Sequence, residues 1–377
     1  ENEFELFLQN IGFSGDPFLH DSEIYSYFDE KRANDNSKYD EWKANLESKL
    51  QSDKNFRQLW NQFNNFETSE VELEWSSDEA SRVVGGKILN EYGLSNKFII
   101  GGSADLAAST KQIISDNTFG SNNFGGNSIE FGIREHAMGG IVNGLALHSN
   151  LIPYGSTFLV FSDYMRPSMR LASLMNINSL FIFTHDSIYL GEDGPTHQPI
   201  EHLMSLRLIP NLDVIRPSNS MELIHSYRYA LEKRDNPKAI ILSRQNMKFF
   251  DNDVSYKDFQ TGAYEFMPGS DITLIATGSE LELAFEISTK LKDLSVQIIS
   301  APILNRLNEE RLESLSLNQN IFTIELGRTI GWDTYIQNIK KSFSIDSFGE
   351  SAPIDQLAEK FNFNAEKISD EIRSLLN

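Results

Sequence analysis

The stretch Ser179-Leu180-Phe181-Ile182-Phe183-Thr184 decides the fold class of this sequence of 377 residues. It contains no charged side chain, which is typical of a short strand covered on both faces of a sheet. Short runs of similar character occur at 97–100, 213–217 and 239–243, and stretches with helical spacing lie between the runs at 79–92, 134–148, 160–174 and 219–233. This alternation predicts an α/β domain with a largely parallel sheet, which we place at residues 68–255.

A second, smaller α/β domain is expected after the first. The polar segment 250–262 indicates a linker, and the alternation then restarts. Strands are predicted at 272–277, 296–299 and 321–324, and helices at 280–292, 307–315, 353–360 and 365–376. We place this domain at residues 256–377.

Residues 1–67 are polar but carry many aromatic side chains, which a disordered tail would rarely do. The spacing of Trp42, Leu46 and Leu50 is helical. We expect an ordered, mostly helical linker that lies over a neighbouring domain and has no core of its own.

The composition excludes several function classes. Cysteine is absent, so disulfides, cysteine-bound zinc, iron–sulfur clusters and thiol nucleophiles are excluded. The formal net charge of −21 repels phosphate backbones, which argues against a nucleic-acid partner. Apolar residues make up 40% of the chain, but no apolar run approaches ~18 residues, so no membrane-spanning helix is expected.

The N-terminus, Glu1-Asn2-Glu3-Phe4, has neither the basic nor the apolar region of a signal peptide. We therefore expect a cytoplasmic protein. It also has no initiator methionine, so we expect the sequence to begin inside a longer chain.

Four common motifs are missing from the sequence: the dinucleotide-binding glycine motif, the P-loop, the His-Glu-x-x-His zinc motif and the Gly-x-Ser-x-Gly elbow. His197 and His202 are five residues apart, which is the wrong spacing for one helix face. We expect no metal ligands in this chain.

Several polar or aromatic segments follow predicted strands, where α/β proteins bind ligands. The loop after Gly101-Gly102 offers Asp105 and Ser109, although alone it is typical of an ordinary capped loop. Glu135 stands near a helix start, where acidic residues are common for dipole reasons.

Phe158, Phe161 and Tyr164 recur every three residues, a spacing that places them on one face of a helix. Such a face usually packs in a core; the alternative is an aromatic wall for a flat heterocycle.

The segments 184–187 and 191–199 bring His185, Asp193 and His197 together on rigid, Gly- and Pro-containing loops, which favours a binding function. Arg244 follows another buried strand and has no acidic neighbour in sequence, which suits an anionic ligand such as phosphate.

Together these segments resemble transketolase. The matching stretches are 102–106, 132–136, 153–158, 184–187, 191–199, 242–246, 277–280 and 348–353, in the family's order. The stretch Gly191-Glu192-Asp193-Gly194-Pro195-Thr196-His197-Gln198-Pro199 is specific by itself. The resemblance runs from about residue 5 to the end, and residues 10–30 look like the end of the family's first domain.

The resemblance implies transfer of a two-carbon ketol unit between phosphosugars, in the pentose phosphate pathway, with thiamine diphosphate and Mg²⁺. Glu135 matches the family's catalytic glutamate, a carboxylic acid that contacts the aminopyrimidine ring nitrogen and favours its imino tautomer. Phe158, Phe161 and Tyr164 match the apolar wall that favours the protonated acid. Asp105 is expected near the thiazolium ring.

The resemblance also implies a set of substrate-binding residues. Arg82, Ser109, His185 and Arg244 match a clamp on the sugar phosphate. Asp193 matches a residue that binds a substrate hydroxyl. His197 matches a catalytic residue near the reacting carbonyl.

The family's first domain, which binds the diphosphate and Mg²⁺ through a Gly-Asp-Gly motif, has no counterpart here; Gly15-Asp16 is followed by Pro17. We therefore expect the metal ligands elsewhere. The sequence is either part of a longer transketolase, one subunit of a split enzyme, or a non-catalytic interaction protein with a dead site. We expect a homodimer, or a partner chain that carries the first domain, and no activity or tight cofactor binding from this chain alone.

Three related enzymes compete with this interpretation. Dihydroxyacetone synthase is the hardest to exclude, because acceptor choice depends partly on residues outside this sequence. Deoxyxylulose-phosphate synthase shares the glutamate and aromatic pocket but not the full set of motifs. The β subunit of a 2-oxo-acid dehydrogenase has no need for the phosphate clamp.

Overall fold

The computed structural model describes residues 2–16, 21–65, 71, 78–114, 117–248, 250 and 254–376. Internal contacts divide the chain into two units, residues 1–65 and 66–377, which we describe separately. Of the predicted domain boundaries, the one at 67/68 falls outside the described residues.

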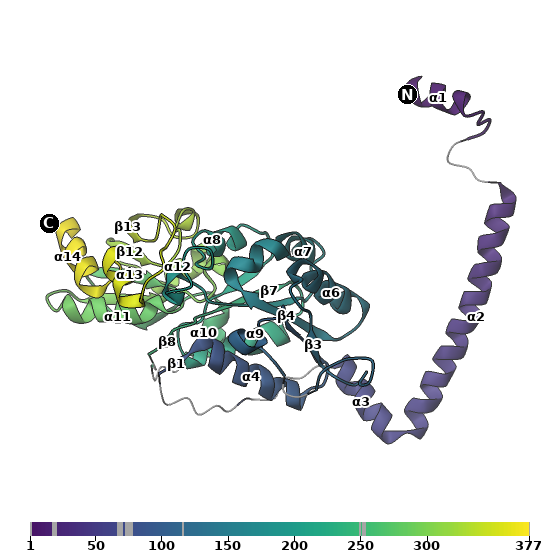
Figure 1. Cartoon of the computed structure of the whole chain (residues 1–377), viewed down its shortest axis with the longest axis horizontal. Coiled ribbons are helices and arrows are strands. Elements are labelled where there is room, and N and C mark those ends of the chain that lie inside the picture. The colour runs from purple at the N-terminus through teal and green to yellow at the C-terminus, as the bar shows by residue number, and fades with distance from the viewer. Residues whose placement is uncertain are drawn as a thin grey trace. The chain divides into compact units, whose positions relative to one another are not determined.

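The first unit consists of three helices, α1 (Asn2–Asn10), α2 (Ser22–Ser52) and α3 (Lys54–Asn64) (Figure 1). None of the three contains a buried residue, as expected of a linker without its own core. The side chain of Asp53 caps α3 by accepting a hydrogen bond from the backbone N–H of Phe56 at 2.9 Å. Residues 17–20, part of the stretch that resembles the family's first domain, lie outside the described residues, and the packing of the linker over a neighbour stays a prediction.

The second unit begins with a six-stranded sheet whose strand order is β3-β2-β4-β5-β7-β6. All its neighbouring strands run parallel, as the sequence predicted. The strands are β2 (Ile99–Ser103), β3 (Ser128–Glu130), β4 (Ile152–Phe158), β5 (Leu180–Thr184), β6 (Asp213–Ile215) and β7 (Lys238–Leu242).

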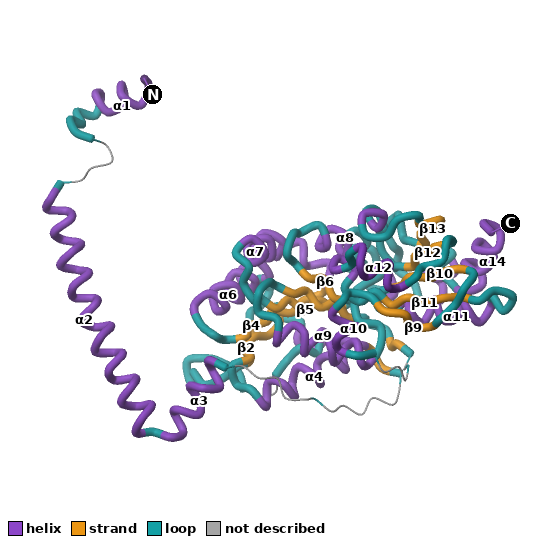
Figure 2. The backbone as a smooth tube through the Cα atoms, turned by 180° about the vertical axis from the view of Figure 1, so that it is seen from behind, coloured by secondary structure: helices purple, strands orange, loops and turns teal. Residues whose placement is uncertain are grey.

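Helices cover both faces of this sheet (Figure 2). On one face lie α4 (Ser81–Ser95) and α9 (Ser220–Glu232). The other face is covered by α6 (Glu135–His148), α7 (Ser162–Leu174) and α8 (His202–Arg207). Because β5 is sandwiched between these layers, all five of its residues are buried, and each buried Phe or Ile contributes about 1.5–3 kcal/mol.

The second sheet has the order β13-β12-β10-β11-β9 and is parallel except for the antiparallel edge strand β9. Its strands are β9 (Tyr264–Met267), β10 (Ile272–Ala276), β11 (Val296–Ser300), β12 (Ile321–Ile324) and β13 (Ile339–Phe343). On one face lie α11 (Glu280–Lys290), α13 (Ile354–Lys360) and α14 (Ala365–Leu376), and on the other η3 (Leu304–Arg306), α12 (Glu309–Leu315) and η4 (Trp332–Thr334). The unit therefore contains two α/β domains, as expected.

The segment predicted as a polar linker is more ordered than expected. It contains α10 (Tyr256–Gln260), and Val254 and Phe259 are buried in the core under the first sheet. Ser255, Lys257 and Asp258 are exposed around these two buried residues, so the polar composition did not indicate a packed connection. Residues 251–253 of the segment lie outside the described residues.

A two-stranded sheet links the start of α4 to the end of the first domain. Its strands β1 (Glu79–Ala80) and β8 (Asn246–Met247) are antiparallel, with Glu79 opposite Met247. This pairing brings residues near 82 and 244 together although they are far apart in the sequence. Within the described ranges, no helix combines the length and the apolar character needed to cross a membrane.

Candidate functional site

A cavity of about 540 Å³ lies at the carboxyl ends of β2 and β4, beside the start of α6. Parallel sheets bind ligands at this edge, because several loops and helix starts converge there. Its lining residues are Ala104, Asp105, Leu106, Ile133, Glu135, Phe158, Phe161, Tyr164 and His197. Six of these, Asp105, Glu135, Phe158, Phe161, Tyr164 and His197, were selected from the sequence.

Glu135 is the first residue of α6 and is only 8% exposed. No residue that the structure describes donates a hydrogen bond or forms an ion pair to its carboxyl group. The carboxyl oxygens are not among the fully buried atoms without a partner, so they are accessible from the cavity that Glu135 lines. A ligand in the cavity can therefore hydrogen-bond to Glu135.

Three aromatic rings form one wall of the cavity. The centroids of Phe158 and Phe161 are 5.8 Å apart with the rings 10° from parallel, and those of Phe161 and Tyr164 are 6.0 Å apart at 27°. The expectation that a single helix face carries all three is wrong. Phe158 ends β4, Phe161 belongs to η1 (Leu159–Phe161), and Tyr164 lies in α7, so a strand-to-helix turn builds the stack.

His197 borders the same cavity from the loop that follows η2 (Ile188–Leu190). Its ring meets that of Phe161 edge-on, with centroids 5.6 Å apart and an interplanar angle of 74°. The hydroxyl of Thr196 lies 3.0 Å from its Nδ1. His197 is therefore held at the rim between the aromatic wall and the loop.

His185 lies directly behind the wall, with its ring centroid 3.7 Å from that of Phe158. Its backbone adopts φ of 60°, a left-handed conformation that only the surrounding structure can maintain. Burial, together with the charges of Arg82 and Arg244 and with His197, lowers the pKa of His185 to about 3. The imidazole is thus neutral near neutral pH.

The other predicted clamp residues lie around His185. The guanidinium of Arg82 donates a hydrogen bond through Nη1 to the carbonyl oxygen of Ser109. Burial and the nearby charge of Arg244 lower the pKa of Arg82. Arg244 is exposed, and among the described residues it has no ion-pair partner. Two uncompensated arginines beside a neutral histidine form a site suited to an anion.

Asp105 and Asp193 differ in their position relative to the cavity. Asp105 lines the cavity, is exposed, and has φ of 60°. Asp193 is exposed on the loop after η2 and is not among the lining residues. The hydroxyl of Ser351 donates a hydrogen bond to the carbonyl oxygen of the preceding Glu192, which ties that loop to the C-terminal domain.

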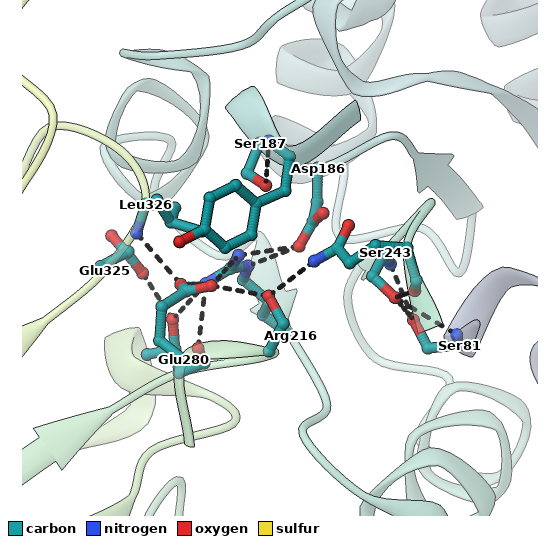
Figure 3. A network of polar contacts seen from close by, with 12 residues as sticks. Ser81, Asp186, Ser187, Arg216, Ser243, Glu280, Glu325 and Leu326 are labelled. Carbon is teal, nitrogen blue, oxygen red and sulfur yellow. Dashed lines mark hydrogen bonds and ion pairs between the residues drawn. The ribbon is translucent and has the colours of Figure 1, made fainter. Parts of the chain in front are cut away.

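Sequence reasoning missed the polar network behind the clamp (Figure 3). Its centre is Arg216, which is completely buried and pairs with Asp186 and Glu280. Arg216 occurred only as part of a predicted strand end, and its partners are 30 and 64 residues away. No local pattern could indicate those contacts.

Within the part of the chain that the structure describes, one group of possible metal ligands lies outside the cavity. Ligand atoms of Asp163, Glu201 and His202 lie within 4.8 Å of one another. The Nε2 atom of His202 is 3.2 Å from a carboxylate oxygen of Asp163, which ties α8 to α7, and both carboxylates are largely exposed. We assign this group no function.

Comparison with known proteins identifies the family. The family profile described as "Transketolase, pyrimidine binding domain" matches residues 80–249, and "Transketolase-like TK C-terminal domain" matches residues 262–364. The chain belongs to the transketolase family. Transketolase from Staphylococcus aureus strain MRSA252 is 38% identical over 403 aligned residues, which include all of this chain and 60% of that protein.

Solved transketolase structures share the fold. The Pichia stipitis transketolase in complex with sedoheptulose 7-phosphate has a TM-score of 0.88 at 28% identity, over 96% of this chain and 56% of that one. Transketolase from Campylobacter jejuni has a TM-score of 0.80 at 34% identity, over 89% of this chain and 53% of that one. The chain thus spans about 60% of the length of this curated relative and somewhat more than half of each of these two solved chains.

Proposed function

We propose that this chain provides the pyrimidine-binding half of a thiamine diphosphate site and a phosphosugar clamp. With its missing complement, it transfers a two-carbon ketol unit from a ketose phosphate to an aldose phosphate. The single observation that carries the proposal is that the Glu135 carboxyl, without a partner among the described residues, lines a cavity beside a stacked aromatic wall. Membership of the transketolase family supports the same assignment.

The residues around the cavity fit an aminopyrimidine ring. A flat heterocycle gains stacking and apolar burial against Phe158 and Phe161. A hydrogen bond between the Glu135 carboxyl group and a ring nitrogen would give that group a partner. When bound, thiamine diphosphate would supply an acidic carbon whose deprotonated form is a nucleophile toward a ketose carbonyl.

The residues of the proposed phosphate clamp have different roles. Arg82 and Arg244 supply positive charge, and the backbone at Ser109 fixes the Arg82 guanidinium. The Thr184 hydroxyl lies 2.8 Å from Nδ1 of His185; when it donates there, the neutral ring keeps its proton on Nε2 and offers it to a phosphate oxygen. Binding energy gained at the phosphate then positions the reacting end of the sugar near His197.

The remaining parts of the site lie outside this sequence in our proposal. We propose that another domain holds the diphosphate and Mg²⁺, because no Gly-Asp-Gly motif is present and the chain spans 60% of its curated relative. That domain comes from a second copy of the full protein, from a partner chain, or from the same chain. We propose domain boundaries at 67/68 and 255/256, Asp193 as a ligand of a substrate hydroxyl, and a cytoplasmic role in pentose phosphate metabolism.

Calorimetry with thiamine diphosphate and Mg²⁺ tests the proposal. The chain alone should bind the cofactor weakly, and addition of a separately produced diphosphate-binding domain should strengthen binding to submicromolar affinity. Phe161→Ala should weaken binding to the mixture, whereas Phe119→Ala, a matched change of an exposed ring outside the cavity, should not. Submicromolar binding by the chain alone, or equal binding by both variants, would refute the proposal.

A further inference from the structure

A turn of the C-terminal domain contributes side chains to the polar network around Arg216 (Figure 3). The turn consists of residues 277–280 and follows the carboxyl end of β10. Its main chain is tied to Arg216 of the first domain, since the backbone N–H of Gly278 donates to the carbonyl oxygen of Arg216 at 3.0 Å. The two domains therefore contact each other at Arg216 and Gly278.

The guanidinium of Arg216 uses its donors on both domains. Nε and Nη2 donate to the same oxygen of Asp186, at 3.1 and 2.7 Å. Nη1 donates to the carbonyl and hydroxyl oxygens of Thr277, at 2.9 and 3.0 Å, and Nη2 donates to Glu280 at 3.0 Å. Asp186, which directly follows His185, is thereby fixed to the C-terminal domain through one rigid, planar group.

A second chain of hydrogen bonds connects the turn to the residues that flank Arg244. The side-chain amide of Gln245 donates to the hydroxyl of Ser279 at 3.1 Å. The hydroxyl of Ser243 donates to the carbonyl oxygen of Gln245 at 2.9 Å. The backbone N–H of Ser243 in turn donates to the hydroxyl of Ser81 at 2.7 Å.

These anchored residues share one property: each is the chain neighbour of a predicted clamp residue. Asp186 follows His185, Ser243 and Gln245 flank Arg244, and Ser81 precedes Arg82. We propose that the turn at residues 277–280 is a positioning element that holds the phosphate clamp in its binding geometry. This inference rests on the proposed phosphosugar-binding function.

The local geometry supports positioning over a purely structural role. The left-handed backbone of His185 needs an external restraint, and the Asp186–Arg216 pair supplies one on the adjacent residue. The side chain of Arg244 is exposed and has no ion-pair partner among the described residues. Its backbone is held by the β1–β8 pairing and by the contacts of its neighbours Ser243 and Gln245. Loss of either restraint therefore spreads the clamp residues without removing any of them.

The test uses the full chain with two conservative variants and one control. Asp186→Asn weakens the link to Arg216, and Ser279→Ala removes the link to Gln245; neither leaves a new cation without a partner, because Glu280 still pairs with Arg216. The control, Trp332→Phe, removes a hydrogen bond of 3.3 Å to Glu325 at the far end of the same network. This control tests whether loss of any hydrogen bond in the network weakens phosphate binding as much as the two variants do.

Two readouts decide the outcome. The first is affinity for ribose 5-phosphate and inorganic phosphate: both variants should lose about tenfold and the control less than about twofold, although the control also loses stability because Trp332 is buried. The second needs no ligand: NMR contacts between the rings of His185 and Phe158 should weaken in Asp186→Asn but persist in the control.

Wild-type affinities together with unchanged ring contacts in Asp186→Asn would overturn the inference, as would an equal loss in the control. If the unaltered chain binds neither phosphate probe, the proposed function fails instead. The ring contacts then still decide whether the turn positions His185.

Discussion

His185 provides the sharpest test of the electrostatics of the site. Burial and the positive charges of Arg82 and Arg244, with a contribution from His197, lower its pKa from 6.5 to about 3. Because the folded state binds fewer protons than the unfolded state between these values, the lowered pKa leaves stability unaffected above about pH 6.5 and reduces it as the pH falls. The stability of the chain should therefore decline on acidification.

The size of the effect follows from the shift. A difference of about 3.5 pKa units corresponds to a ceiling of about 4.8 kcal/mol, reached only below about pH 3. At about pH 5, where most of the unfolded histidine but little of the folded one is protonated, the loss is about 2 kcal/mol. Solvent screening reduces this free-energy loss only slightly, since His185 is 4% exposed.

Histidine-selective NMR measures this pKa directly, with His185→Gln assigning the resonance among the seven histidines. Titration of the free chain should leave His185 neutral down to about pH 4. Inorganic phosphate should raise its pKa, because the anion offsets the two arginines. Unfolding experiments should show that His185→Gln loses about 2 kcal/mol less than the unaltered chain between about pH 7.5 and 5. A pKa above about 6 that phosphate does not change would refute this reasoning.

Three further substitutions should have separable effects. Tyr164→Ala should leave the melting temperature within about 2 °C, because Tyr164 is 63% exposed, but weaken thiamine diphosphate binding in the completed enzyme; equal cofactor affinity would exclude Tyr164 from the wall. Arg207→Leu should cost about 3–5 kcal/mol in urea unfolding, because it leaves the buried Glu325 without its bidentate partner; a loss under about 1 kcal/mol would contradict the pairing. Gly102→Ala should lower the melting temperature, since a Cβ atom there would overlap the carbonyl oxygen of Ile129 on β3, and an unchanged value would count against the strand pairing.

The main features of the fold are predictable from local patterns. Uncharged runs such as the one at Phe181 and helical periods such as 219–233 reflect burial between layers, and the observed β5 and α9 lie within them. Strand β4 was not among the predicted strands, although it pairs with both β2 and β5. It contains Pro153, and proline is disfavoured in central strands, so β-strand patterns do not readily indicate it.

Only those residues of the candidate site that belong to recognisable sequence motifs were predictable. Glu135 and Phe158, which the resemblance selected, line the same cavity. The stacking of the aromatic residues across a strand end, a turn and a helix depends on the tertiary structure and not on a helical repeat. Arg216 was invisible for the same reason: its chemistry comes from partners on another strand and another domain, which a sequence pattern does not reveal.

Ketol transfer by the completed enzyme tests the central claim most directly. The chain should be combined with a diphosphate-binding domain, thiamine diphosphate and Mg²⁺, and supplied with xylulose 5-phosphate and ribose 5-phosphate. Transfer of two carbons should yield a seven-carbon ketose phosphate and a triose phosphate. Glu135→Gln should reduce turnover at least about 100-fold without changing the melting temperature, whereas Glu130→Gln, an exposed carboxylate on β3, should retain it. Equal turnover in the two variants would contradict the role assigned to Glu135 and the account built on it.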